Sequence, residues 1–204
     1  MKIAIIGKSK LNLDHIKKDI AEAGFEFTEK SPDWVISFGG DGTLLATERT
    51  FPNIPKLPLK DSLTCQKCHD CSFAHALDLL KNKKYQTEEL IKLECSVGDQ
   101  KLICMNDIVV RNDVPTHALR FSVEVNDKKY KDLIGDGIVV ATPFGSTGYH
   151  ESITRNSFEK GMGIAFNNLT KPLKHLVVDD NSIIKVKINR RTGFLVADNN
   201  KDFI

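Results

Sequence analysis

The chain has 204 residues, which is enough for one large domain or two small ones. Hydrophobic residues make up 41% and charged residues 27%, a composition typical of globular proteins that excludes a disordered chain. The 29 Lys and Arg against 27 Asp and Glu leave a net charge of +2, which gives no electrostatic reason to expect nucleic acid or a membrane surface as partner.

The amino-terminal half of the sequence predicts strands that alternate with helices. Residues 2–7, KIAIIG, form a short β-branched run that ends at a glycine, as buried strands do. Apolar residues recur at helical spacing over 14–23, and two further short strands are expected at 25–28 and 33–38. This order favours a parallel α/β sheet, whose ligands bind beyond the carboxyl ends of the strands.

The glycine-rich stretch GGDGT, residues 39–43, directly follows the last of these strands. A helix over 43–49 would place backbone amides beside the glycine turn, where a phosphate can bind. The alternative is that Asp41 only caps this helix, a role that aspartate often fills. GGDGT by itself leaves both interpretations open.

The carboxy-terminal half of the sequence has β character and frequent turn signals. Its expected strands are residues 90–97, 102–111, 119–125, 138–141 and 183–188. Turns such as Asn126-Asp127 separate them, so the pattern predicts a mostly antiparallel sheet. We therefore expect an α/β domain over residues 1–87 and a β-rich domain over residues 88–204.

Three motifs carry a family resemblance: GGDGT at 39–43, MNDIVV at 105–110 and GDGIVVATPFGSTGY at 135–149. The third is the most specific, because a strand is followed by Thr-Pro and then by a Gly-Ser-Thr-Gly-Tyr turn. In this order the motifs resemble those of the NAD kinase family. The sequence around Gly7-Lys8-Ser9 lacks the earlier glycine of a GxxxxGK[ST] loop, so that kind of phosphate site is excluded there.

The resemblance implies a Rossmann-like amino-terminal domain, a mostly antiparallel, β-sandwich-like NAD-binding domain and a site between them. The family transfers a phosphoryl group from ATP, in some cases from polyphosphate, to the adenosine 2′-hydroxyl of NAD, which gives NADP. It works with Mg²⁺ and as homo-oligomers. The resemblance thus predicts an enzyme that binds NAD and ATP and assembles as a homodimer or homotetramer.

The same resemblance assigns roles to individual residues. Asp41 would be the general base, because a carboxylate within hydrogen-bond reach of an alcohol can accept its proton. The GGDGT amides would cradle phosphate, the NDIVV residues would bind ribose and dinucleotide, the Thr-Gly-Tyr segment would line the adenine pocket, and Asp136 would contact the nicotinamide from a neighbouring subunit. The predicted nucleotide-binding residues are Gly39, Gly40, Gly42, Thr43, Asn106, Asp107, Asp136, Thr147, Gly148, Tyr149 and Ser152.

Each assignment has a structural alternative. Asn106 and Asp107 could simply shape the entry to a strand, and Tyr149 could be a core aromatic. Asp136 lies between two glycines, a natural hairpin turn. His150 is the only histidine near these motifs that we expect to reach a ligand.

The sequence also departs from the family pattern, which keeps two other functions open. After GGDGT the family usually continues with Gly-Ile-Asn, where this chain has PKLPL at 55–59, and Asp107 stands where glutamate is usual. One alternative is a lipid or sphingoid kinase, since those enzymes share a related fold and a GGDGT-like turn. The other is a dinucleotide-binding protein without catalytic activity. The NDIVV and TPFGSTGY motifs argue against the first, and the presence of Asp41 argues against the second.

A cysteine cluster distinguishes this chain from that family pattern. Cys65, Cys68 and Cys71 lie at two successive CxxC spacings, and His75 follows four residues later. Three thiolates can bind one zinc ion, and a histidine or a thiolate from elsewhere can complete the tetrahedron, so we predict structural Zn²⁺ at these four residues. A reduced loop without metal is the alternative. No apolar run approaches the roughly 20 residues of a membrane helix, and MKIAIIGKSK is too quickly polar for a signal peptide. We therefore expect a cytoplasmic protein whose five cysteines are reduced.

Overall fold

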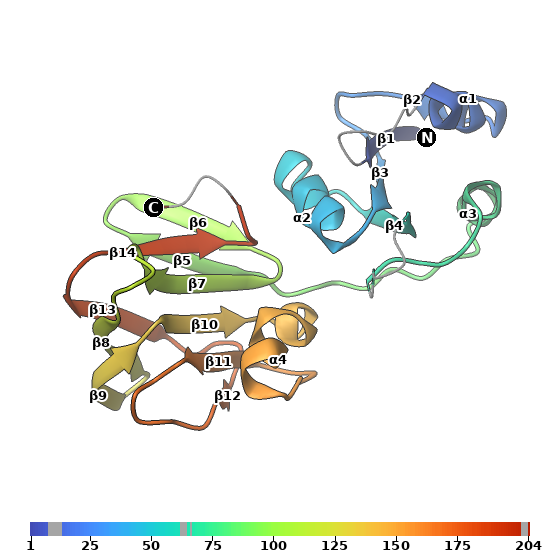
Figure 1. The fold of residues 1–204 in the computed structure, drawn as a ribbon. Coiled ribbons are helices and arrows are strands. Elements are labelled where there is room, and N and C mark those ends of the chain that lie inside the picture. The colour runs from blue at the N-terminus through green and yellow to red at the C-terminus, as the bar shows by residue number, and fades with distance from the viewer. Residues whose placement is uncertain (8–13, 62–64, 66, 201–203) are drawn as a thin grey trace. The chain divides into compact units, whose positions relative to one another are not determined.

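A computed structural model describes residues 1–7, 14–61, 65, 67–200 and 204. The chain divides into two compact units, Met1–Glu89 and Leu90–Ile204. The first unit is α/β and the second is mainly antiparallel β, which confirms the predicted fold class (Figure 1). Within the described ranges, no helix is long and apolar enough to cross a membrane.

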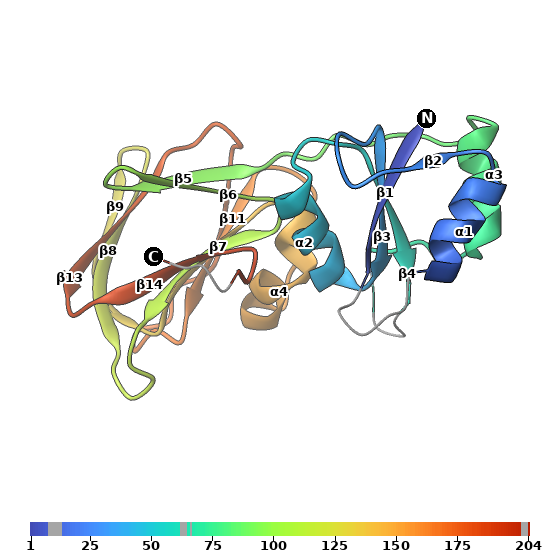
Figure 2. The same ribbon diagram turned by 90° about the horizontal axis from the view of Figure 1, so that it is seen from above.

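The first unit is a four-stranded parallel sheet with helices on both faces. Its elements are β1 (Lys2–Gly7), α1 (Asp14–Glu22), β2 (Glu26–Phe27), β3 (Trp34–Gly39), α2 (Asp41–Thr50), β4 (Lys56–Lys60) and α3 (Phe73–Lys81). The strand order is β2-β1-β3-β4 and every pair is parallel. Helices α1 and α3 cover one face, and α2 covers the other (Figure 2).

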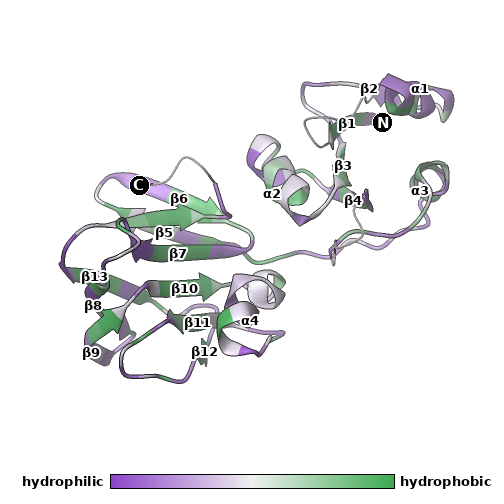
Figure 3. Ribbon diagram, viewed as in Figure 1, coloured by the Kyte–Doolittle hydropathy of each residue, from purple (hydrophilic) through white to green (hydrophobic). Residues whose placement is uncertain are grey.

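Alternation along the strands explains why both faces of this sheet are covered. Ile3, Ile36 and Leu59 point to the face of α1 and α3 and are almost fully buried. They pack against α1 and α3 through Ile16, Ile20, Ala76, Leu77 and Leu80. The intervening side chains, such as Val35, point to the other face and are equally buried. Ile16 and Ile20 of α1 face the sheet, and Figure 3 shows that the rest of α1 is mainly hydrophilic.

The strand order creates a switch point between β1 and β3. From β1 the chain continues to β2 on one side, whereas β3 and β4 lie on the other. In open parallel sheets, a crevice for ligands forms at the carboxyl ends of the two strands where the order diverges. β3 ends at Gly39, so the GGDGT stretch begins at this switch point.

The second unit contains two antiparallel sheets and a hairpin. Its elements are β5 (Leu93–Val97), β6 (Gln100–Cys104), β7 (Asp107–Asn112), β8 (Leu119–Val125), β9 (Lys128–Gly135), β10 (Gly137–Ala141), the 3₁₀ helix η1 (Phe144–Thr147), α4 (Tyr149–Thr154), β11 (Met162–Asn167), β12 (Leu176–Val178), β13 (Ile184–Arg190) and β14 (Gly193–Ala197). The larger sheet has the order β12-β11-β10-β7-β14, the smaller has β13-β8-β9, and β5 pairs with β6.

The two sheets of this unit pack together around one apolar core. Phe121 and Val123 of β8 are 1% exposed and belong to the same cluster as Ile138 of β10 and Ile164 of β11. Val139 and Ala165 alternate with those residues and point to the opposite face, where Ile153 of α4 covers them. The larger sheet is thus covered on both faces, and α4 stands on the face away from the sandwich core.

Candidate active site

Asp41 is the first residue of α2 and follows the glycine turn after β3. The N-cap of α2 is Gly40, which has no side chain with which to cap the helix. The helix-capping interpretation of Asp41 is therefore wrong. Its carboxylate is exposed; Oδ1 accepts the backbone N–H of Lys67 at 3.3 Å and lies 3.1 Å from Cys65 Sγ.

The residues around Asp41 form a tight corner between strand and helix. A Cβ atom at Gly39 would lie 2.3 Å from Thr43 Oγ1, so no side chain fits there. The backbone N–H groups of Thr43 and Leu44 both donate to the Gly40 carbonyl oxygen, at 2.9 and 3.1 Å, and start the helix. A Cβ at Gly42 would meet open space. The amino end of α2 carries a partial positive charge and is suited to a phosphate.

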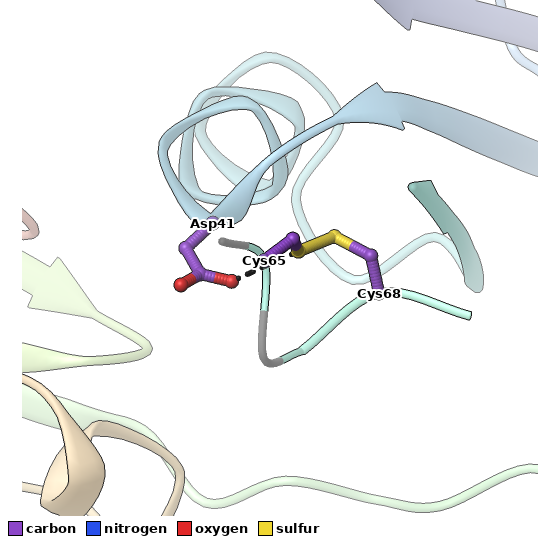
Figure 4. Close-up of side chains that lie close together, drawn as sticks. All are labelled: Asp41, Cys65 and Cys68. Atoms are coloured by element: carbon purple, nitrogen blue, oxygen red, sulfur yellow. Dashed lines mark hydrogen bonds between the residues drawn. A yellow bond between two sulfur atoms is a disulfide. The ribbon is translucent and has the colours of Figure 1, made fainter. Parts of the chain in front are cut away.

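Cys65 and Cys68 form a disulfide beside Asp41, with their Cα atoms 5.8 Å apart (Figure 4). The prediction that all five cysteines are reduced is wrong for this pair, because CxxC spacing brings two Cα atoms within the distance that a disulfide spans. Cys71 is a free thiol that packs against the core of the first unit.

The predicted zinc ligands are not gathered into one set in this part of the chain. Of the side chains that the structure describes, only Asp41, Cys65 and Cys68 form a group of three potential metal ligands, all within 4.8 Å of one another. Neither Cys71 nor His75 belongs to it. His75 lies in the first turn of α3, where its backbone N–H donates to Ser72 Oγ at 3.2 Å.

In the second unit, a buried carboxylate that the sequence analysis missed organises the NDIVV motif. Asp198 is 4% exposed and directly follows β14. Its two oxygens accept the backbone N–H groups of Met105 at 2.8 Å, Asn106 at 2.7 Å and Asp107 at 3.3 Å. The turn between β6 and β7 therefore takes its shape from Asp198. The only sequence signal was an acidic residue at the end of the apolar run GFLVA.

The NDIVV and TPFGSTGY motifs lie against each other in this unit. Thr142 Oγ1 donates to the Met105 carbonyl oxygen at 2.7 Å and accepts the Gly145 N–H at 3.0 Å. A Cβ at Gly145 would lie 2.0 Å from the Asn106 carbonyl oxygen, so the two loops approach as closely as backbones can. Asn106 Nδ2 in turn donates to Asp107 Oδ2 at 2.9 Å.

Asp107 is 5% exposed, and its environment disfavours a charge. Burial, followed by the negative charge of Asp198, raises the pKa of Asp107 to about 6, although the hydrogen bond from Asn106 opposes the shift. The folded protein therefore binds this proton more tightly than the unfolded chain does. Protonation of Asp107 therefore stabilises the folded protein at low pH, and this contribution to the free energy of unfolding is lost as the pH rises through about 6.

We expect Asp107→Asn to unfold less readily than the parent at pH 7, by about 1 to 3 kcal/mol, because the amide removes a buried charge. The difference should shrink towards pH 5, where the parent carboxyl is mostly protonated. Urea unfolding of both proteins at the two pH values measures this. The exposed Asp180→Asn is the matched control and should show no such pH dependence. If the free energies of unfolding of Asp107→Asn and the parent differ by the same amount at both pH values, the raised pKa of Asp107 is contradicted.

The Thr-Gly-Tyr segment borders an open pocket of about 340 Å³. It is lined by Thr147, Gly148, Glu151, Ser152 and Arg155, three of which belong to the predicted adenine pocket. Glu151 and Arg155 were not predicted. They lie four residues apart and reach the pocket through the helical spacing of α4, and no helix was expected there from the sequence.

Tyr149 and His150 face opposite environments at the start of α4. Tyr149 is 38% exposed, and its hydroxyl accepts the side-chain N–H of Asn167 at 3.0 Å, so it is not a core aromatic. His150 is fully buried, with Nδ1 3.1 Å from the Asn156 carbonyl oxygen. Burial lowers its pKa. The expectation that His150 contacts a ligand is therefore wrong.

Asp136 lies at the opposite end of β10 from these motifs. It occupies the turn between β9 and β10, and its Oδ2 accepts the side-chain N–H of Asn168 at 3.0 Å. Thr142 follows Asp136 by six residues along β10, which is roughly 20 Å at strand rise. The second unit therefore does not bring Asp136 near Asn106 or Asp107.

In the first unit, GGDGT lies at the switch point of a parallel sheet, and in the second unit, NDIVV lies against TPFGSTGY in a β-sandwich. Residues 105–203 match the family model described as the ATP-NAD kinase C-terminal domain. An NAD kinase of Sulfurisphaera tokodaii is 32% identical over 198 residues, covering 92% of this chain and 78% of that protein. One of Clostridium perfringens is 29% identical, covering 95% and 76%. The chain belongs to the NAD kinase family.

Solved structures show the same fold. An NAD kinase from Archaeoglobus fulgidus in complex with ATP matches with a TM-score of 0.82 and 20% identity, over 100% of this chain and 86% of that one. A yeast NADH kinase complexed with NADH matches with a TM-score of 0.80 and 16% identity, over 98% and 73%.

Proposed function

We propose that this chain transfers the γ-phosphoryl group of ATP to the adenosine 2′-hydroxyl of NAD, which gives NADP and ADP. The observation that carries the proposal is Asp41, whose exposed carboxylate stands at the switch point of the first unit and is not used to cap its helix. The family gives this position a chemical purpose, because an alcohol attacking phosphorus must lose its proton.

In the proposed reaction, Asp41 accepts the proton of the 2′-hydroxyl while the new oxygen–phosphorus bond forms and the bond to ADP breaks. The amides of GGDGT and the amino end of α2 hold the phosphates, at a corner where Gly39 admits no side chain. In the second unit, Asn106 and Asp107 bind the ribose and the dinucleotide, and Thr147, Gly148, Tyr149 and Ser152 bind the adenine. We propose residues 1–87 and 88–204 as the corresponding domains.

We propose Mg²⁺ as the metal that accompanies ATP. Mg²⁺ typically binds one or two carboxylates together with substrate phosphates, and an exposed carboxylate beside a phosphate-binding helix end fits that chemistry. The ion would neutralise phosphate charge when bound with ATP. The proposed location is the cytoplasm, where ATP and NAD are both available.

Labelled ATP offered with NAD or with diacylglycerol tests the function. We expect labelled NADP and no labelled lipid, and polyphosphate in place of ATP shows whether a second donor is accepted. Labelled lipid without NADP would identify a lipid kinase. Heat on mixing with NAD, with no product under saturating ATP and Mg²⁺, would identify a dinucleotide-binding protein without catalytic activity.

Oligomerisation gives a separate prediction, because Asp136 would serve a neighbouring subunit's ligand. We expect light scattering to show at least a dimer. Asp136→Ala and Asp41→Asn should each be nearly inactive, yet their mixture after subunit exchange should regain up to about a quarter of parental turnover, because half of the dimers are mixed and each has one intact site. A monomer with full activity, or a mixture no more active than its parts, would contradict shared sites.

The zinc prediction for Cys65, Cys68, Cys71 and His75 requires reduced thiols, since disulfide sulfurs cannot serve as thiolate ligands. We expect about one equivalent of zinc per chain in protein reduced without chelator, and none after oxidation. Elemental analysis measures both. Less than about a tenth of an equivalent in the reduced protein would leave this segment without a metal role.

A further inference from the structure

The Cys65–Cys68 disulfide touches the carboxylate that the proposed reaction needs. Cys65 Sγ lies 3.1 Å from Asp41 Oδ1, and the Lys67 N–H donates to the same oxygen at 3.3 Å. Figure 4 shows the disulfide directed at this oxygen of Asp41. Both contacts come from one segment of the first unit, so the disulfide and the base belong to one local structure.

These contacts restrict Asp41 as a base. A hydroxyl that gives up its proton must come within about 2.6 to 3.2 Å of a carboxylate oxygen, and the sulfur holds that place at Oδ1. In the oxidised protein, one of the two carboxylate oxygens of Asp41 is therefore obstructed.

We propose that Cys65 and Cys68 are a thiol–disulfide exchange site for a small dithiol or dithiol protein, and that reduction there speeds the kinase. The inference rests on the proposed role of Asp41. Both cysteines are partly exposed, which exchange requires. Cys71 is also partly exposed, but it is a free thiol.

The exchange is balanced by the dithiol. One of its thiolates attacks a sulfur of the pair, the Cys65–Cys68 bond breaks, and a mixed disulfide forms. Its second thiol then resolves the mixed disulfide and releases the protein. Two electrons pass to the protein, two protons end on Cys65 and Cys68, and the reagent leaves as its own disulfide. Cys65 is then no longer held beside Asp41 by its bond to Cys68.

The first experiment compares turnover of the two redox forms in zinc-free buffer. Alkylation and intact mass should count three free thiols in the oxidised protein and five in the reduced one. We expect the reduced form to make NADP at least about tenfold faster. The double variant Cys65→Ser/Cys68→Ser should be fast with or without reductant, while Cys95→Ser should keep the parental response. Rates within about twofold of each other, with thiol counts of three and five, would overturn the proposal.

A second measurement does not depend on kinase activity. A thiolate that attacks Cys65 Sγ approaches the Asp41 charge, so Asp41→Asn should be reduced by the small dithiol dithiothreitol several-fold faster than the parent. Asp70→Asn is the matched control, because it removes one charge from the same segment but pairs with Lys60 at 3.3 Å. Equal reduction rates for Asp41→Asn and the parent would overturn the inference that exchange at Cys65 takes place beside the Asp41 carboxylate. If neither redox form makes NADP, the proposed function fails. The reduction rate of Asp41→Asn relative to the parent still tests whether Cys65 and Cys68 exchange with thiols beside Asp41.

Discussion

Asp41→Asn should lower the turnover of NAD by about two orders of magnitude or more, with little change in NAD affinity or thermal stability. Asparagine keeps the size of the side chain and its ability to accept the Lys67 N–H, but it cannot take a proton from the 2′-hydroxyl. Stability should hold because Gly40, not Asp41, is the N-cap of α2. The measurement is a steady-state assay on reduced protein with NAD and ATP saturating.

The reduced state matters for this comparison, because the oxidised parent would itself be slow. Asp61→Asn, which also lies after the carboxyl end of a strand in the first unit, controls for the loss of one charge there. Its turnover should stay within about threefold of the parent. An Asp41→Asn protein that binds NAD and also stays within about threefold would remove Asp41 from the catalytic role.

The first unit was predictable from its sequence wherever the pattern was local. The strand and helix at 2–7 and 14–23 appear as β1 and α1 because short β-branched runs and helical spacing need no distant partner. β4 was missed because Lys56–Lys60 contains Pro58, which is unusual in a strand. It is tolerated because β4 is the last strand of its sheet, and the outer side of β4 carries only a bridge between Leu59 and His69 among the described residues.

In the second unit the sequence predicted strands better than their boundaries. The run 102–111 was expected as one strand but divides into β6 and β7 at Met105 and Asn106. The break is fixed by Asp198, which is more than ninety residues away and takes the backbone N–H of both residues. Strands β11 and β14 were missed because MGIAFN and GFLVA are short and carry glycine, so only pairing across the sheet defines them.

The candidate site shows the same limit. Motif order located Asp41, Asn106 and Asp107, and neighbouring residues in a motif stay together in any fold. The disulfide at Asp41 depends on where a long loop returns, which spacing alone does not determine. From the CxxC spacing we predicted zinc, with a reduced loop as the alternative, and only the fold shows that Cys65 and Cys68 are joined by a disulfide.

Asp198→Ala should destabilise the second unit by about 3 to 5 kcal/mol, because three backbone N–H groups lose their acceptor in a buried place. Asp198 also has φ of 49°, a left-handed conformation that alanine adopts with strain and asparagine tolerates. Asp198→Asn therefore isolates the loss of the carboxylate, and we expect it to cost about 1 to 3 kcal/mol. Urea unfolding measures both, with the exposed Asp180→Ala as control.

Asp198→Asn should also change the titration of Asp107 in the proposed nucleotide site, which a purely structural role of Asp198 would not do. The charge of Asp198 is one of the causes that raise the pKa of Asp107, so Asp198→Asn should lower that pKa from about 6 towards its ordinary value. The change in stability between pH 5 and pH 7 that Asp107 causes should shrink in parallel. NAD affinity should fall as well, because Asn106 and Asp107 lose the group that orders their backbone. A variant as stable as the parent, with an unchanged pH profile, would show that the N–H groups of Met105, Asn106 and Asp107 do not depend on Asp198.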